Sequence, residues 1–189
     1  MIPRPKFLIP NSSLKGVSME LTVLNWIQTL RTGWLDGVMV FVSAVCNHGE
    51  VWIVLAAVLL LFPKTRRVGF TVALALLLDV IVCNGILKPL IGRVRPCTVN
   101  PAVELPVACP TDASFPSGHT ASSFAAVGAL WAAGSRLWLP GLALAVLIAV
   151  SRLYLYVHWP TDVLFGALLG WGLGYLARWL LRKAEGLRK

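Results

Sequence analysis

Three short polar clusters interrupt an otherwise apolar chain, and their residue types are those that handle a phosphate group. The clusters read Lys88-x6-Arg95-Pro96, then Pro116-Ser117-Gly118-His119, then Ser151-Arg152-x5-His158-x3-Asp162. Cations bind phosphate oxygens, and an imidazole can attack phosphorus or protonate a leaving oxygen. The clusters therefore predict a site that binds a phosphate and transfers it through a histidine.

The first cluster offers two cations of different shape. Lys88 follows a long apolar run, and Arg95 is expected in a loop because Pro96 disfavours helix at the residue before it. A planar guanidinium and a compact ammonium could clamp the oxygens of one phosphate. Taken alone, a Lys and an Arg at the end of an apolar helix are more typical of interfacial anchors.

The second cluster opens an apolar run and is typical of a helix start. The free N–H groups of a first helical turn bind anions, and Gly118 lets the backbone approach a ligand closely. Helix capping alone would explain Ser117 and Gly118. Capping does not explain His119, which would face the same anion site.

The third cluster predicts an oriented histidine. A helix is expected to start near Pro160, which places Asp162 in its first turn, within reach of the His158 ring. A carboxylate on one ring nitrogen fixes the tautomer and leaves the other nitrogen free to attack. The alternative is that Asp162 only favours the helix dipole and His158 is an interfacial bystander. This cluster alone leaves both interpretations open.

The elements that position these clusters are predicted to be membrane helices. The chain has 189 residues, of which 57% are hydrophobic and 13% charged, too apolar for a soluble domain. We expect an all-α polytopic bundle of about six transmembrane helices, with five as the main alternative, in a single domain spanning residues 1–189. The segment Glu20–Arg31 is expected to be an amphipathic interfacial helix, with Leu21, Leu24, Ile27 and Leu30 on one face. One long tilted first helix is the other interpretation.

The net charge of +9 could indicate nucleic acid, but its distribution argues against that partner. With six spans and both termini in the cytoplasm, only four of the 17 Lys and Arg side chains lie outside: Lys88, Arg93, Arg95 and Arg152. This bias follows the positive-inside rule. It predicts a multi-pass protein of the plasma (inner) membrane, with residues 1–18 and the basic tail 182–189 cytoplasmic and the active-site loop 88–118 extracytoplasmic.

The four cysteines fall into two classes. Cys83 and Cys46 lie in or near apolar runs and are expected to be free thiols. Cys97 and Cys109 bracket the predicted outer loop, where an oxidising compartment permits a disulfide. We predict a Cys97–Cys109 bond, with two unpaired thiols as the alternative.

The three clusters, in this order and at these spacings, resemble the type 2 phosphatidic acid phosphatase superfamily, the membrane lipid phosphatases related to vanadium haloperoxidases. The family pattern K-x6-R-P, P-S-G-H and S-R-x5-H-x3-D is matched without substitution. The resemblance covers the chain from about residue 68 to its end.

The resemblance implies an enzyme that hydrolyses a lipid phosphate through a phosphohistidine, without a metal or cofactor. By that resemblance His158 is the nucleophile, Asp162 orients it and His119 is the general acid, while Lys88, Arg95, Ser117, Gly118 and Arg152 bind the phosphate. Metal ligation by His119, His158 and Asp162 is the chemical alternative, which the surrounding cations disfavour. A vanadate-dependent haloperoxidase and a non-enzymatic lipid-binding or transport protein are the other function classes.

Among bacterial roles in that family, undecaprenyl diphosphate hydrolysis is favoured because it requires an outward-facing site. Phosphatidylglycerophosphate and phosphatidic acid are the alternative substrates. Four further polar residues are left outside the predicted site, namely His48, Glu50, Asp79 and Asn84. Asp79 is expected to pair with a polar group of another span, and Asn84 could orient Lys88.

Overall fold

The chain is all-helical in the residues described by this computed structural model, 11–47 and 49–187. The elements are α1 (Asn11–Gln28), α2 (Gly33–Ala44), α3 (Glu50–Leu61), α4 (Arg66–Asp79), the π-helical segment η1 (Val80–Leu87), α5 (Lys88–Ile91), α6 (Pro96–Val99), α7 (Gly118–Ala132), α8 (Trp138–Tyr154) and α9 (Pro160–Gly186). The predicted all-α class is confirmed for these residues.

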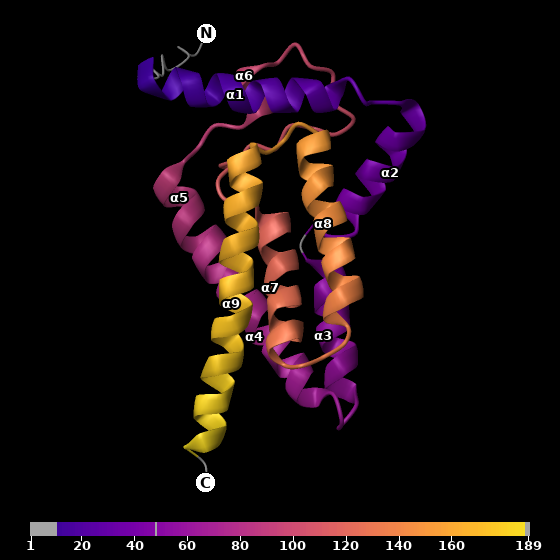
Figure 1. Cartoon of the computed structure of the whole chain (residues 1–189), viewed down its shortest axis with the longest axis vertical. Coiled ribbons are helices and arrows are strands. Elements are labelled where there is room, and N and C mark those ends of the chain that lie inside the picture. Colours follow the sequence, from indigo (N-terminus) through magenta and orange to yellow (C-terminus); the bar gives the residue numbers. More distant parts are fainter. Residues whose placement is uncertain (1–10, 48, 188–189) are drawn as a thin grey trace.

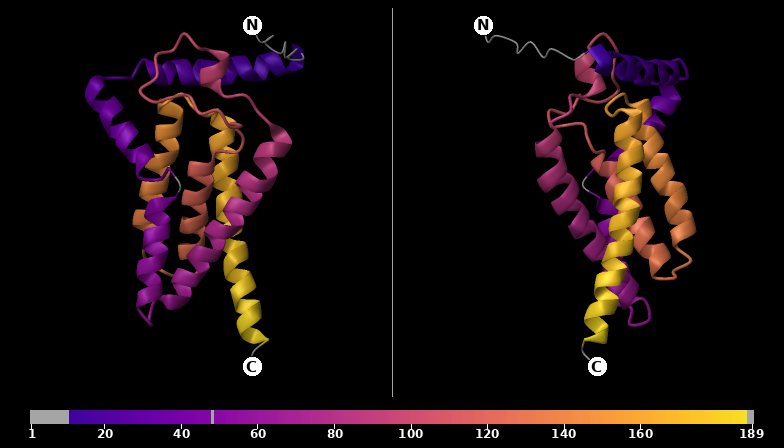
Figure 2. Two further views of the ribbon diagram at one scale, coloured as in Figure 1. Left: turned by 180° about the vertical axis from the view of Figure 1, so that it is seen from behind. Right: turned by 60° about the vertical axis from the view of Figure 1, so that its left-hand side comes forward.

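The helices form an upright bundle with α1 lying across one end (Figure 1). The helix α7 stands in the middle, where nine of its 15 residues are buried. The helices α4, α8 and α9 pack around it, and Figure 2 shows the same arrangement from behind and from the side. The loop 92–117 and the turn 155–159 lie at the end that α1 covers.

The helices α2 and α3 run one after the other in the same direction along the bundle (Figure 1). Each has 12 residues, which is roughly 18 Å of helix and too short to cross a hydrocarbon core of about 30 Å alone. In series they make one full pass. The break between them ends at Gly49, whose φ of 79° lies in the left-handed region that glycine adopts readily.

This break changes the predicted topology. The segment α4–η1–α5 returns to the α1 end, and α7, α8 and α9 then alternate in direction (Figure 1), so the predicted number of about six transmembrane helices is not confirmed. As a result α1 and the end of α9 lie at opposite ends of the bundle (Figure 1). The prediction that both ends of the chain lie on one side is therefore wrong for the described residues. Residues 11–18 were expected on the side of the membrane opposite the active site. They belong to α1, which lies across the end of the bundle that carries the loop 92–117.

Apolar length by itself identifies fewer crossings. Within the described residues, two helical stretches have both the length and the composition to cross a membrane, Arg66–Val99 and Pro160–Gly186. The helices Gly33–Ala44, Glu50–Leu61 and Trp138–Tyr154 are apolar but shorter.

The amphipathic character predicted for Glu20–Arg31 is present, but its apolar face packs on protein. Leu24 is fully buried, and Leu21 and Ile27 pack with it against the 154–159 segment. Leu30 is half exposed. The helix ends at Gln28 and α2 starts at Gly33, so the alternative of one long first helix is wrong.

Glycines bring α7 and α9 into backbone contact. A Cβ placed on Gly170 would lie 2.1 Å from the carbonyl oxygen of Ala121, and one on Gly174 would lie 2.4 Å from the nitrogen of Ala129. Small residues at such crossings let two helix backbones approach closely. This contact fixes the start of α7 against the start of α9, where two of the three clusters lie.

Candidate active site

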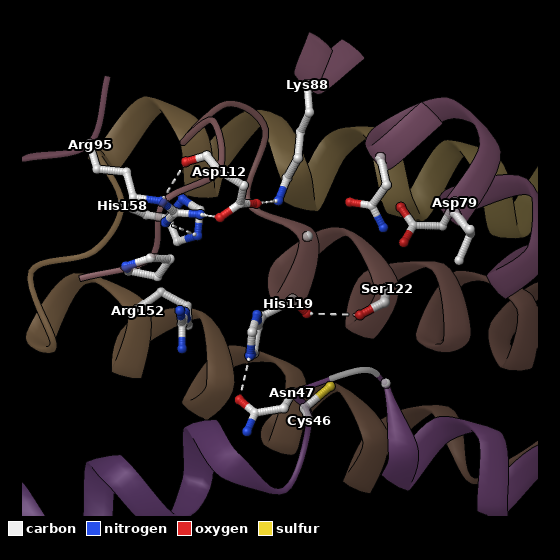
Figure 3. Close-up of a pocket in the computed structure, with 15 residues that line it drawn as sticks. Cys46, Asn47, Asp79, Lys88, Arg95, Asp112, His119, Ser122, Arg152 and His158 are labelled. Atoms are coloured by element: carbon white, nitrogen blue, oxygen red, sulfur yellow. Dashed lines mark hydrogen bonds and ion pairs between the residues drawn. The ribbon is translucent and has the colours of Figure 1, made fainter. Parts of the chain in front are cut away.

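The three polar clusters meet at one cavity of about 690 Å³ inside the bundle (Figure 3). Six of the eight predicted site residues line it: Lys88, Arg95, Gly118, His119, Arg152 and His158. The two others, Ser117 and Asp162, are fully buried behind the lining. The sequence prediction that these residues converge is thus matched by their placement.

The arginine of the first cluster is held by backbone carbonyls. Arg95 Nε donates to the Asp112 oxygen at 2.9 Å, and Nη1 donates to the Val157 oxygen at 2.7 Å. Its Nη2 reaches the Ala113 oxygen at 3.3 Å and the Asp112 carboxylate at 2.8 Å. These contacts fix the fork with Nη1 only 3.2 Å from His158 Nε2.

Asp112 is a site residue that the sequence did not reveal. Its carboxylate bridges the two cations of the first cluster, with one oxygen on Lys88 and the other on Arg95. Partial burial would raise the pKa of Asp112, but the Lys88 and Arg95 charges outweigh it and lower that pKa to about 2. The carboxylate is therefore an anion that occupies donors suited to a phosphate.

The His158 ring is fixed in one tautomer. Its Nδ1–H donates to the Ser114 carbonyl oxygen at 2.8 Å, which leaves the Nε2 lone pair directed towards Arg95. Burial lowers the pKa of His158 to about 4; the nearby Asp162 carboxylate opposes that shift, and the Arg95 and Arg152 charges add to it. The ring is thus neutral near pH 7, with its nucleophilic nitrogen available.

Asp162 stands beside this ring but is not its closest acceptor. The distance from His158 Nδ1 to Asp162 Oδ2 is 3.6 Å, longer than the 2.8 Å to the Ser114 oxygen. The carboxylate accepts hydrogen bonds from Arg93 Nη1 at 2.6 Å, the Ser114 hydroxyl at 2.6 Å and the Trp159 backbone N–H at 2.9 Å. The expected carboxylate–imidazole pair is therefore part of a larger network.

Arg93 connects this network to α1. Besides Asp162, its Nη2 contacts the Glu20 carboxylate at 2.5 Å, and Glu20 also accepts from the Thr161 hydroxyl at 2.6 Å. Of the four cations predicted to lie outside the cytoplasm, Arg93 is the one that belongs to none of the three polar clusters. Its position two residues before Arg95, on the same loop, is the signal that could have found it.

The second cluster forms the first turn of α7, as predicted. The His119 Nε2–H donates to the Asn47 side-chain oxygen at 3.3 Å, across from the α2–α3 break. Gly118 faces the cavity, and a Cβ there would lie 4.0 Å from Lys88 Nζ. The Ser117 hydroxyl instead forms a hydrogen bond with the Thr120 hydroxyl at 3.0 Å, and the Ser117 backbone N–H donates to the backbone carbonyl oxygen of Asp162. Ser117 therefore stabilises the turn and does not face the cavity.

Arg152 completes the cationic side of the cavity. Its side chain is 6% exposed, and Nη1 donates to the Ser43 hydroxyl. Its Nε has no hydrogen-bond partner within the described ranges. A buried guanidinium with donors to spare is suited to bind an anion.

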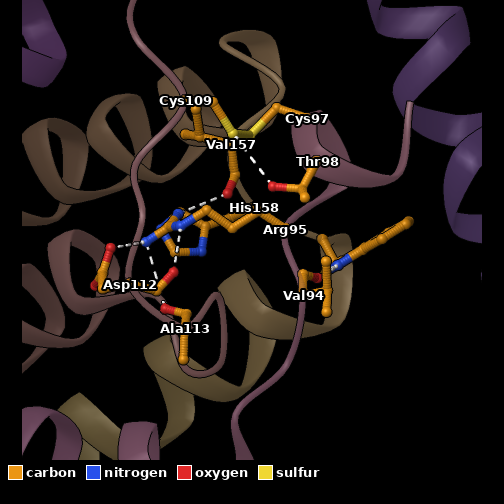
Figure 4. The surroundings of a disulfide bond; sticks show 10 residues. Val94, Arg95, Cys97, Thr98, Cys109, Asp112, Ala113, Val157 and His158 are labelled. Carbon is orange, nitrogen blue, oxygen red and sulfur yellow. Dashed lines mark hydrogen bonds and ion pairs between the residues drawn. A yellow bond between two sulfur atoms is a disulfide. The ribbon is translucent and has the colours of Figure 1, made fainter. Parts of the chain in front are cut away.

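A disulfide braces the loop that carries Arg95 and Asp112. Cys97 and Cys109 are bonded, as predicted, and Cys46 and Cys83 are free thiols (Figure 4). The bond ties the segment just after Arg95 to the segment just before Asp112.

Three of the four polar residues left outside the predicted site can be placed, and His48 lies outside the described residues. Asp79 and Asn84 both line the cavity. The expectation that Asp79 pairs across the bundle fails for its Oδ1, which has no partner in the described part of the chain. Lys88, which Asn84 was expected to orient, is paired with Asp112. Glu50 opens α3 directly after the break.

The charge pattern favours an anion over a metal. Three cations line the cavity with the two imidazoles, and Asp162 is turned away into its own hydrogen bonds. A divalent ion would be repelled there, whereas a phosphate would find donors from several directions.

Comparison with known proteins agrees with this chemistry. Residues 65–185 match the PAP2 superfamily, so the chain belongs to that family. It is 39% identical over 166 residues to an undecaprenyl-diphosphatase of Sulfolobus acidocaldarius, covering 86% of this chain and 77% of that protein. It is 35% identical over 128 residues to a decaprenylphosphoryl-5-phosphoribose phosphatase of Mycobacterium tuberculosis, covering 68% and 70%.

A solved structure shares the fold. The crystal structure of a transmembrane PAP2 type phosphatidylglycerolphosphate phosphatase from Bacillus subtilis superposes with a TM-score of 0.73 at 26% identity, covering 92% of this chain and 88% of that one. The protein is accordingly a lipid phosphatase, a hydrolase of the PAP2 superfamily.

Proposed function

We propose that the protein hydrolyses a membrane lipid phosphate through a phosphohistidine on His158. The observation that carries the proposal is the His158 ring, whose Nδ1–H is held by Ser114 while Nε2 faces a cavity lined by three cations. A neutral imidazole with one nitrogen anchored is a nucleophile ready to attack phosphorus.

The reaction proceeds in two displacements. His158 Nε2 forms a bond to phosphorus while the bond to the leaving oxygen breaks, and His119 gives that oxygen a proton. Water then gives a proton to His119 and attacks phosphorus, and the P–N bond breaks to release inorganic phosphate and the free imidazole. Lys88, Arg95 and Arg152 neutralise the charge that the equatorial oxygens carry in both steps, which is the main catalytic term in phosphoryl transfer.

The leading substrate is undecaprenyl diphosphate, which the 39% identical relative supports. A phosphomonoester such as phosphatidylglycerophosphate is the second candidate. It is favoured by the part of the cavity away from His158, which Asp79 and Ser122 line and where no described cation lies.

The active-site end is proposed to face away from the cytoplasm in a multi-pass plasma-membrane protein. Exposed cations gather at the opposite end, namely Lys64, Arg66, Arg67, Arg136, Arg182 and Lys183. Among the described side chains of the α1 end, Arg93 and Arg95 are instead engaged by carboxylates and Arg152 is buried in the site. Under the positive-inside rule the end with exposed cations is cytoplasmic. This orientation places α1 outside, in contrast to the predicted cytoplasmic N-terminal segment.

Phosphate release by purified protein in detergent tests the proposal. Wild type should release phosphate from undecaprenyl diphosphate, and acid quenching with labelled substrate should trap phosphate on the protein. His158→Ala should abolish both signals, because the attacking nitrogen is gone. His119→Ala should slow the poorest leaving groups most, and Asp162→Asn should be severe but leave residual turnover. Full activity in His158→Ala would overturn the assignment, and lipid binding without phosphate release would favour a transport role.

A further inference from the structure

The cavity has two chemically different sides (Figure 3). Arg95, Arg152 and His158 lie on one side, and the Lys88 ammonium is turned towards Asp112 there. Asp79 and Ser122 lie on the other side, with His119 between the two groups. The cationic side is already assigned to the transferred phosphoryl group.

Asp79 is the unexplained residue of the second side. It is 2% exposed, and its Oδ1 is buried without a hydrogen-bond partner in the described residues. Buried carboxyl oxygens are nearly always hydrogen-bonded, because losing water without a replacement costs on the order of 1–3 kcal/mol. Asp79 lines the cavity, and Figure 3 shows its carboxyl group on the cavity side.

The local backbone presents Asp79 and Asn84 on the same wall. Asp79 ends α4, and the chain then widens into the π-helical turns of η1, which carry Asn84. Both residues line the cavity. Widened helical turns of this kind are frequent at functional sites.

The direction of the reaction places the leaving group on this side. In phosphoryl transfer the attacking and leaving atoms lie roughly in line, so the leaving group points away from His158. It then passes His119, the proposed acid, and enters the space between Asp79 and Ser122. The Ser122 hydroxyl donates to the His119 carbonyl oxygen at 3.2 Å, which leaves its own oxygen as an acceptor.

We infer that Asp79, with Asn84 and Ser122, forms a subsite for a hydroxyl group on the leaving group, next to the scissile ester. The subsite takes the polyol part of a lipid phosphomonoester, such as a glycerol or sugar that carries the phosphate. An acceptor oxygen without a donor matches a hydroxyl, which brings one hydrogen to give. The second phosphate of a lipid diphosphate is an anion and gains no such bond. The inference rests on the proposed phosphatase function and extends it to this substrate class.

A matched lipid pair tests the subsite. Lysophosphatidic acid carries a hydroxyl on the carbon next to the phosphate-bearing carbon, and its 2-deoxy analogue of equal chain length lacks it. A net hydrogen bond contributes roughly 0.5–1.5 kcal/mol, so wild type should favour the hydroxyl lipid by about 2- to 10-fold in kcat/KM. Asp79→Leu should bring that ratio close to one. Asp79→Asn keeps an acceptor oxygen and should retain a clear preference.

The control is Thr71→Val on the same helix, whose hydroxyl bonds the Arg67 carbonyl oxygen within α4. It should leave the ratio at the wild-type value. Thermal unfolding gives a second readout: Asp79→Leu removes a buried carboxyl group whose Oδ1 lacks a partner in the described residues and should raise the Tm, whereas loss of a structural contact would lower it.

An unchanged ratio in Asp79→Leu, or a wild-type ratio near one, would overturn the subsite. Failure of the phosphatase proposal looks different, because wild type would then release phosphate from neither lipid nor from undecaprenyl diphosphate. In that case, calorimetric binding of the same two lipids to wild type and Asp79→Leu decides the subsite alone.

Discussion

Replacement of Gly170 by alanine should separate α7 from α9 and thereby disable the site. The added Cβ would lie 2.1 Å from the Ala121 carbonyl oxygen and 2.8 Å from the Ala125 nitrogen. Ordinary contact begins near 3.4 Å, so the two backbones must move apart by roughly 1 Å. Overpacking of this kind costs about 1–3 kcal/mol, because neither neighbour is a side chain that can rotate away.

The displacement acts on catalysis through the ends of the two helices. The first turn of α7 carries Gly118 and His119, and α9 starts two residues after His158 and carries Asp162. A misplacement of about 1 Å between catalytic groups can cost on the order of 100-fold in rate. We therefore expect Gly170→Ala to lower kcat by about 100-fold and KM to change much less.

Gly172→Ala is the matched control on the same helix. A Cβ at Gly172 has nothing within 4 Å, and Gly to Ala in a helix is intrinsically favourable by roughly 1 kcal/mol. Phosphate release and Tm should therefore stay at or above wild type in this variant. If Gly170→Ala were as active and as stable as Gly172→Ala, the close contact would not position the site.

Four further outcomes are expected. Asp112→Asn removes the anion that competes with phosphate for the cations, so orthovanadate should inhibit about 5- to 30-fold more tightly. This range corresponds to two half-exposed charged hydrogen bonds of about 0.5–1 kcal/mol each. The control Thr111→Val should leave vanadate inhibition unchanged, and weaker inhibition of Asp112→Asn would contradict the competition. As pH falls from about 6.5 to about 4, unfolded chains protonate His158 before folded ones do, so the free energy of unfolding of wild type should fall by up to about 3 kcal/mol. The fall should be smaller in His158→Gln, and equal pH profiles of Tm in the two proteins would contradict the lowered pKa. Turnover should persist in chelator, and a strict need for an added divalent ion would refute the anion-site assignment. Reduction of the disulfide, or the double substitution Cys97→Ser with Cys109→Ser, should lower the Tm, because up to roughly 3 kcal/mol of stability is lost. An alkylated, unlinked Cys97 peptide from unreduced protein would rule the bond out.

The residues that converge on the cavity could be predicted because their signals are local. Proline at 160 starts α9, and that start alone places Asp162 one turn after His158. The tetrapeptide at 116–119 likewise starts α7 at Gly118. Apolar runs indicate helices with equal reliability, since unpaired backbone groups are too costly in lipid.

The partners that hold these residues could not be predicted, because they come from loops distant in sequence. Ser114 reaches His158 across 44 positions, and Arg93 reaches Asp162 across 69. Asp112 follows a threonine in a polar loop and resembles any turn residue until the fold brings it to Lys88. The α2–α3 break was equally hidden, because the polar stretch around Gly49 is also typical of a hairpin between two spans.

The loop 92–117 explains how a buried imidazole stays neutral beside a carboxylate. Most of the hydrogen-bonding capacity of Asp162 is taken by Arg93, Ser114 and the Trp159 backbone, so little of its charge remains to stabilise a protonated ring. Burial and the cations Arg95 and Arg152 then lower the pKa of His158 to about 4. The network thus keeps the nucleophile unprotonated, with its Nε2 lone pair on the side of the cavity lined by Arg95.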